Sequence, residues 1–350
     1  MSQKGMDNGM SDAIWAISIT WLFVFIYAIL GSVDFGAGFW GLVYNPRERS
    51  RAGEIANRFL SPTWEVTNVF LVLLVVTIVA FFPRAIAPLG TGLLIPGSLV
   101  LILLTLRSAF MVFHYSALRF RSTLRIVSGV TGLLIPSLLV IALPILAGGF
   151  IDPETDRLLV GKLLSSPVTY AYLAFGLSSE LFLSAAFLAD YSREAEDSSA
   201  YAVFRKYALW LGPFTLATAV LTVYLMGRQA EWLRDHILEE QGWFLLSAIA
   251  FLLGYSALWW RRKHPERERG FPRVAFVCFI LQFALASYAY GAAHLPYLVY
   301  PTLTVEESVT NPAMFDSLLI SYAVGMAILV PGFIYFWRLF LKDKRYVGRG

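Results

Sequence analysis

The chain has 350 residues, of which 57% are hydrophobic and only 15% are charged, and its formal net charge is +4. Soluble domains are less apolar and carry about 25% charged residues, so this composition excludes an ordinary soluble domain and indicates an integral membrane protein. At about 20 apolar residues per spanning helix, the length accommodates about eight to ten spans. The single cysteine, Cys278, excludes an internal disulfide and a CxxC redox pair.

Nine apolar runs follow one another along the chain, and each predicts one spanning helix of a single all-α integral membrane domain covering residues 1–350. They comprise residues 13–44, 63–82, 85–118, 125–150, 167–191, 205–227, 242–260, 272–292 and 314–337. Prolines inside several runs are tolerated in membrane bundles because neighbouring helices satisfy the freed carbonyl groups. Residues 1–12 lead into the first run without a small-residue cleavage pattern, so we expect no removable signal peptide.

The uneven distribution of lysine and arginine predicts the orientation. Most of the 28 basic residues fall in the first, third, fifth and seventh connectors and in the C-terminal tail. The other side has only Lys4, Arg84, Arg157, Lys162, Arg228 and Arg234. Since basic connectors remain in the cytoplasm, nine transmembrane helices place the N-terminus outside and the C-terminus in the cytoplasm. This segregation by membrane side gives no indication of nucleic-acid binding.

Two acidic residues lie where hydrocarbon is expected: Asp34 near the end of the first run and Glu65 near the start of the second. An acid within the membrane is costly and is therefore a functional candidate by default. In the predicted orientation both acids lie toward the cytoplasm, where a narrow inlet would let them exchange protons. For Glu65 a second interpretation stays open, because an acid in a first helical turn also stabilises the helix N-terminus.

Further charged residues lie inside or at the ends of the predicted spans. Arg107 is the one cation within a span and needs a counter-charge, for which Asp34, Glu65, Glu180 or a bound anion are candidates. A structural ion pair is the simplest interpretation. Glu180, the deepest acid, is either a relay member or the partner of a charge on another chain. Asp190 is predicted to be a helix cap or a partner of Arg193.

The sequence contains few residues that could bind a haem or a metal ion. His114 and His294 are the only histidines placed for a haem, but haem sites in bundles usually need two ligands on facing helices. The more ordinary interpretation is a histidine at the membrane interface whose ring nitrogens are hydrogen-bonded and bind no haem. No phosphate-binding loop, dinucleotide fingerprint or serine-nucleophile motif occurs, and we predict no metal ligands. The residues alone fit either a proton-conducting subunit or a transporter.

Two short segments bear on that choice. The sequence TGLLIP occurs at residues 91–96 and again at 131–136, which would fit the inverted repeats of a transporter, although coincidence explains six residues of common membrane composition. Residues 230–240 place Trp232, Leu233, His236 and Ile237 on one helical face. They predict a short helix lying in the membrane interface.

At its two acidic stretches the sequence resembles subunit II of cytochrome bd-type quinol oxidases, in the short-loop form found in bacilli. The matching segments are SVDFGAGFW, SPTWEVTNVFLVLLVVTIVAFFP, LTLRSAF around Arg107, AHLPYLVYPTLTVEESVT and LVPGFIYFWRLF. They are collinear and cover nearly the whole chain. Asp34 matches the acid of the family's first motif, and Glu65 matches the acid after its tryptophan, here Trp64. Many relatives have an additional acid where Gly31 stands, and most have aspartate where Glu65 stands.

The resemblance implies two four-helix bundles plus one peripheral helix, in a heterodimer with a haem-bearing subunit I in the bacterial plasma membrane. Such a complex oxidises ubiquinol or menaquinol and reduces O2 to water, with haem b and haem d and the quinol site in subunit I, and it can include a small single-helix accessory subunit. For this chain it implies proton transfer by Asp34 and Glu65. To these we add Arg107, Glu180 and Trp64 as our own candidates for electrostatic anchor or relay residues. The alternatives are a secondary transporter and a purely structural assembly subunit.

Overall fold

The structure is a computed structural model that describes residues 3–44, 51–113, 121–152, 154–260, 269–309 and 312–341. Its long helices are α1 (Gln3–Val43), α2 (Ala52–Phe81), α4 (Leu94–Phe113), α5 (Arg121–Val140), α8 (Pro167–Glu194), α9 (Ser198–Met226), α11 (Gln241–Ala257), α12 (Pro272–His294) and α14 (Pro312–Leu341). The short elements are η1 (Pro83–Ala85), α3 (Ile86–Gly92), α6 (Ala142–Ala147), α7 (Val160–Ser165), α10 (Glu231–Glu239), β1 (Tyr297–Val299), β2 (Leu303–Thr304) and α13 (Val305–Ser308).

Seven helices within the described residues are long and apolar enough to cross a membrane. In two further places, two consecutive helices are long and apolar enough to cross a membrane only when they are taken together. Residues 65–81 and 83–92 are bent by 104° at the break between them, and residues 231–239 and 241–257 by 70°. The number of spans is therefore seven, or up to nine if each bent pair counts as one span.

Two predicted helix boundaries are wrong. The helix expected at 63–82 begins at Ala52, because Ala52, Ile55 and Ala56 are buried in the same core cluster as Trp40 of α1, so packing extends the helix beyond its apolar run. The run at 85–118 does not form one helix, because α3 ends at Gly92 and α4 begins at Leu94, and the intervening Leu93 has a non-helical backbone (φ −101°, ψ 10°). A separate break at Phe82, which precedes a proline, divides α2 from η1.

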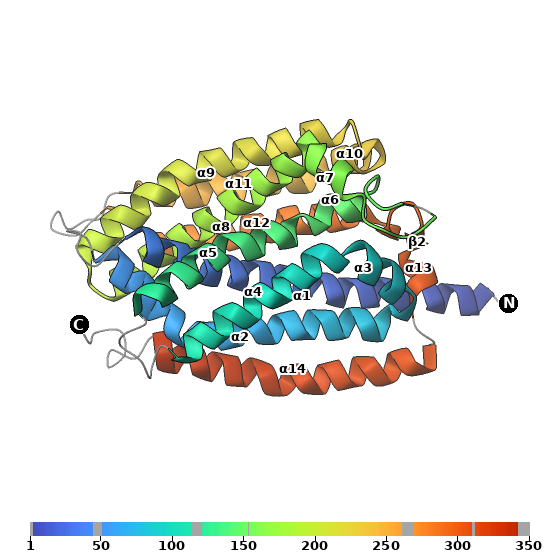
Figure 1. Ribbon diagram of the computed structural model, residues 1–350, viewed down its shortest axis with the longest axis horizontal. Coiled ribbons are helices and arrows are strands. Elements are labelled where there is room, and N and C mark those ends of the chain that lie inside the picture. Colours follow the sequence, from blue (N-terminus) through green and yellow to red (C-terminus); the bar gives the residue numbers. More distant parts are fainter. Residues whose placement is uncertain are drawn as a thin grey trace.

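The long helices form two groups joined along α1 and α8 (Figure 1). In the first group α1 packs against α2 and α5, and α4 packs against α5. In the second, α8 packs against α9 and α12, and α12 against α11. Helix α14 lies at the edge of the molecule beside α2, where most of its surface is exposed.

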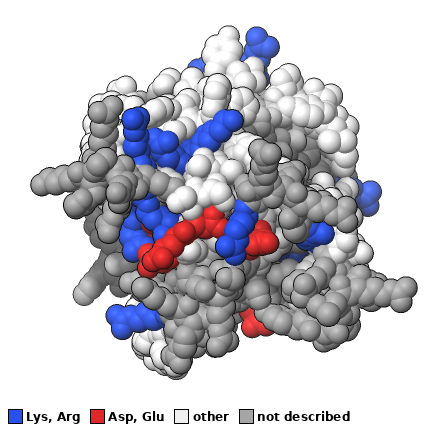
Figure 2. Space-filling model, turned by 90° about the vertical axis from the view of Figure 1, so that its left-hand side faces the viewer, with Lys and Arg blue, Asp and Glu red and all other residues white. Residues whose placement is uncertain are grey.

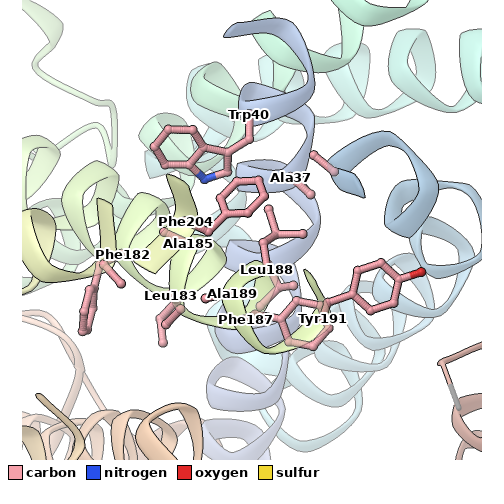
Figure 3. Close-up of a cluster of buried hydrophobic side chains, with 14 of the residues drawn as sticks. Ala37, Trp40, Phe182, Leu183, Ala185, Phe187, Leu188, Ala189, Tyr191 and Phe204 are labelled. Carbon is pink, nitrogen blue, oxygen red and sulfur yellow. The ribbon is translucent and has the colours of Figure 1, made fainter. Parts of the chain in front are cut away.

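The largest buried cluster fills the junction between the two groups. Trp40 of α1 packs edge-on against Phe204 of α9, with ring centroids 6.1 Å apart, and donates a hydrogen bond to Ser184 Oγ of α8 at 3.0 Å. Phe182 and Leu188 of α8 lie in the same cluster (Figure 3). This packing fixes the last third of α1, which contains Asp34, against α8.

A small cap covers the end of the molecule at which α1 begins (Figure 1). It contains the β1–β2 hairpin, α13 and the amphipathic helix α10. Leu233 and Ile237 of α10 are buried, Trp232 stacks on Tyr300 at 4.5 Å, and the His236 ring lies 3.1 Å from the carbonyl oxygen of Ala293. The face predicted for residues 230–240 therefore packs on the protein.

Candidate functional site

Asp34 lies inside the protein about 14 Å from the C-terminal end of α1, given a rise of 1.5 Å per residue. Its side chain is only 3% exposed, and its Oδ2 atom lies 3.0 Å from a terminal nitrogen of Arg107 on α4. The same nitrogen donates a hydrogen bond to the backbone carbonyl of Asp34 at 3.2 Å. A buried ion pair therefore joins α1 to α4, as the ion-pair interpretation of Arg107 predicts.

Arg107 also binds α5 through its other terminal nitrogen. This nitrogen donates to the carbonyl oxygen of Ser128 at 2.8 Å and lies 3.5 Å from the hydroxyl of Thr131. The guanidinium sits over the ring of Phe35, 5.1 Å from its centroid. Because a planar guanidinium presents several donors in a fixed geometry, one buried side chain holds three helices in register.

Two glycines allow the backbones of α1 and α5 to come this close. A Cβ atom on Gly38 would lie 2.7 Å from the carbonyl oxygen of Ser128, and one on Gly132 would lie 2.4 Å from the carbonyl oxygen of Phe35. Backbone atoms cannot rotate away, so any side chain at either position would push the helices apart. Small residues at such contacts are the usual means of close helix packing in membranes.

Glu180 of α8 approaches this ion pair from the second helix group. It is 1% exposed, and neither carboxylate oxygen has a hydrogen-bond partner in the part of the chain that the structure describes. Its backbone carbonyl would lie 3.3 Å from a Cβ on Gly36, two residues beyond Asp34, and its charge interacts with that of Arg107. Asp34, Arg107 and Glu180 therefore form one buried group of ionisable side chains, which we call the buried charge cluster.

Glu65 occupies a different environment. It lies about 20 Å along α2 from the start of the helix at Ala52, so the first-turn interpretation is wrong. Its side chain is exposed on the surface of the chain, whereas Asp34 is buried. Within this chain the two acids do not line one inlet. The side chain of Trp64 lies outside the described residues.

The remaining candidates are dispersed. Asp190 forms its ion pair with Arg273 of α12 at 3.1 Å, a partner that the sequence did not predict. The expected partner Arg193 lies close enough for its charge to interact with that of Asp190, and it donates a hydrogen bond to the carbonyl of Gly270. His294 is half-buried at the end of α12, and its ring lies 5.5 Å from the Trp232 ring. His114 lies outside the described residues.

Charged side chains gather at the end of the molecule nearest Asp34 (Figure 2). There Arg51 contacts Glu54 and Asp197, and Arg273 bridges Asp190 and Glu194. This end carries the connectors that the basic residues assign to the cytoplasm. The pairs are largely exposed, so each contributes little to stability.

Sequence reasoning missed three polar residues that surround the buried charge cluster. Ser128 and Thr131 present their oxygen atoms to Arg107, and the only signal was their spacing of three residues on one face of an apolar helix. Tyr27 lies two turns before Asp34 on α1, and its buried hydroxyl has no partner among the described residues. Aromatic residues are too common in membrane spans for Tyr27 to stand out.

Comparisons with known proteins agree with this arrangement. Residues 12–340 match the family model of cytochrome bd terminal oxidase subunit II. The chain is 48% identical over 340 residues to the putative cytochrome bd menaquinol oxidase subunit II of Bacillus subtilis (strain 168), covering 96% of this chain and 98% of the relative. A chain of the bd oxidase structure from Geobacillus thermodenitrificans superposes with a TM-score of 0.81 and 35% identity, covering 95% of this chain and all of that one. This chain therefore belongs to the family of cytochrome bd terminal oxidase subunit II.

Proposed function

We propose that this chain supplies protons to the oxygen-reducing centre of a bd-type quinol oxidase, in addition to completing the complex. Family membership makes it a multi-pass protein of the bacterial plasma membrane and a subunit of a respiratory oxidoreductase. The relative from Bacillus subtilis is named as a menaquinol oxidase subunit, and menaquinol is accordingly the quinol that we propose. Reduction of O2 to water consumes protons, so a route for them through the protein is required.

The buried charge cluster is the observation that carries this proposal. Two carboxyl groups share one guanidinium inside the bundle, with Arg107 bound to Asp34 and electrostatically coupled to Glu180. Isolated buried charges are costly, so the cluster can lose or gain a proton only if its remaining charges rebalance. When Asp34 takes up a proton, Arg107 can compensate an ionised Glu180. The cluster thereby offers two proton-holding sites with a common counter-charge.

We further propose nine spans, with the N-terminus outside and the C-terminus in the cytoplasm. The distribution of basic residues supports this orientation, as does the position of the two ends of the chain, since α1 begins and α14 finishes at opposite ends of the molecule (Figure 1). In this orientation Asp34 lies in the cytoplasmic half of the membrane. Protons then reach the cluster from the cytoplasm.

Glu65 is exposed at the surface of α2, so its proposed role differs from that of the buried Asp34. An ionisable side chain facing lipid is unfavourable, whereas one facing another subunit or a water-filled cavity is not. We therefore propose that subunit I covers this face of α2 and that Glu65 passes protons at the interface. Trp64, which precedes it, would lie at the same boundary.

We assign the haems, of b and d type, and the quinol site to subunit I. His294 does not fit a haem, because its ring is stacked on Tyr290 with centroids 6.0 Å apart and packed against Trp232. The ring of the neighbouring His236 packs on the same tryptophan and is already hydrogen-bonded to the carbonyl oxygen of Ala293. Two surface cavities of the described residues, of about 460 and 320 Å³, are lined by no histidine. The partners proposed for this chain are subunit I and a small single-helix accessory subunit.

A secondary transporter has less support. The two TGLLIP segments lie in unlike surroundings: the first spans the break between α3 and α4, whereas the second lies within α5 and places Thr131 beside Arg107. They do not behave as equivalent halves of a repeat. A purely structural subunit would explain the Asp34–Arg107 pair, which holds helices together, but it leaves without a function the buried Glu180 carboxylate, which has no hydrogen-bond partner among the described residues.

An optical reduced-minus-oxidised spectrum tests the proposed function, using the complex purified through a tag on this chain. We expect a haem-bearing partner to copurify and to show both b and d bands. A b band without a d band would contradict the assigned haem types but keep the oxidase. A colourless preparation with no partner chain would overturn the oxidase and favour the transporter.

A further inference from the structure

The cavity of about 460 Å³ has no part in the proposed proton route. It lies at the end of the molecule where α1 begins, about 20 Å along α8 from Glu180 of the buried charge cluster, and it is open to the surface. Helix α7, the start of α8 and the end of α9 form its walls, and Lys162, Ser166, Arg228 and Gln229 supply its polar groups. No acidic residue lines it.

Two cations converge on this cavity. Lys162 and Arg228 are both exposed, and neither side chain has a hydrogen bond or ion pair with any residue that the structure describes. Other basic side chains at this end are engaged: Arg84 donates to the carbonyl of Glu307 at 3.0 Å, and Arg234 pairs with neighbouring acids. Basic residues are scarce on this side of the protein. Because Lys162 and Arg228 line one cavity and neither pairs with an acidic residue of the described chain, we expect an anion from outside the chain to bind between them.

The floor of the cavity is shaped for a compact group. Gly149 has a φ angle of +87°, which favours glycine, and a Cβ atom there would stand 3.9 Å from Lys162 Nζ and 4.0 Å from Gln229 Cγ. Because glycine has no Cβ atom, the space between the side chains of Lys162 and Gln229 stays open. Ser166 donates to Gln229 Oε1 at 2.6 Å, which leaves the amide nitrogen of Gln229 as a donor. The first turn of α8 adds the positive end of a long helix.

We propose that this cavity binds a phosphate group, and that the phosphate belongs to the headgroup of an anionic phospholipid. Tyr224, in the last turn of α9 and four residues before Arg228, is 70% exposed, and Tyr170 of α8 is 55% exposed. Exposed aromatic side chains next to a charged site are typical of the membrane interface. A headgroup in the cavity would therefore have its acyl chains along α8 and α9. Free inorganic phosphate carries the same negatively charged group but has no acyl chains to contact α8 and α9.

Photolabelling of the purified complex tests the site. The probe is a photoreactive phosphatidylglycerol at sub-saturating concentration, and the readout is the labelling of peptides from residues 149–170 and 224–234. We expect Lys162→Gln and Arg228→Gln each to reduce labelling about fivefold and the double variant about 25-fold. Arg157→Gln is the matched control, because Arg157 is exposed at the same end but does not line the cavity.

Competition identifies the source of the phosphate. If millimolar inorganic phosphate leaves labelling of the wild-type complex unchanged, the lipid is the ligand as proposed. If it abolishes labelling with the same dependence on Lys162 and Arg228, the cavity binds free phosphate and the lipid assignment is overturned. Equal labelling of the wild-type complex and the double variant would overturn the site altogether. Both residues are exposed, so these substitutions leave the core intact, which the unfolding temperature of the complex checks.

Discussion

Replacing Arg107 with leucine is expected to remove most of the assembled complex from the membrane. Arg107 is the cation that the structure places 3.0 Å from buried Asp34, and its donors also hold the Ser128 carbonyl of α5. Removing one partner of a buried ion pair costs about 3–5 kcal/mol, a large fraction of the total stability of a typical protein. The amount of haem-bearing complex recovered through a tag on this chain measures the effect.

Two further variants separate the charge from the packing. Arg157→Leu removes an exposed arginine at the other end of the molecule and should leave recovery unchanged. Combining Arg107→Leu with Asp34→Asn removes both charges and should restore much of the lost complex, since replacing a whole buried pair is far less harmful than breaking it. Full recovery of the complex with Arg107→Leu alone would show that the pair does not hold α1, α4 and α5 together.

Replacing Gly132 with valine is expected to be comparably damaging, although no charge changes. A Cβ at this position meets the carbonyl oxygen of Phe35 at 2.4 Å, so α1 and α5 must separate, and Phe35 directly follows Asp34. Overpacking of this kind costs about 1–3 kcal/mol or more. We expect the unfolding midpoint of the solubilised complex to fall by about 5 °C or more.

The matched control for this substitution is Gly97→Val in the neighbouring helix α4. A Cβ on Gly97 meets no atom within 4 Å, so the substitution adds the same side chain to an apolar helix without a clash. Both variants replace a helical glycine with valine, so the change in intrinsic helix propensity is the same in the two. If the two valines lowered the midpoint equally, close packing of α1 on α5 would not be what Gly132 provides.

The sequence predicted the ion pair because membrane physics restricts charges so strongly. Arg107 is a cation within an apolar run, and Asp34 was one of its few possible counter-charges. The apolar runs also predicted a mostly helical chain, and the described residues contain seven helices able to span a membrane, or up to nine if each bent pair is one span. Long apolar runs identify spans reliably because almost every position must tolerate lipid or another helix.

Other features depend on packing that a hydropathy pattern does not encode. Helix α2 starts well before its apolar run because Ala52 and Ile55 pack within the protein. The exposure of Glu65 depends on which face of α2 turns away from α1, and the pairing of Asp190 with Arg273 depends on how α8 meets α12. Each of these outcomes is set by contacts between helices that are distant in the sequence.

The most direct test of proton transfer through the buried charge cluster is the quinol-driven O2 consumption of the Asp34→Asn complex at matched haem content. Asparagine keeps an oxygen that can accept a hydrogen bond from Arg107, which retains its bond to the Ser128 carbonyl, so haem content should stay near normal. We predict turnover at least tenfold lower, and a smaller loss with Glu180→Gln. If the Asp34→Asn complex assembles poorly, the Asp34→Asn, Arg107→Leu double variant provides the comparison, with turnover still low. Full turnover per haem in either Asp34 variant would contradict a role for this cluster in proton transfer.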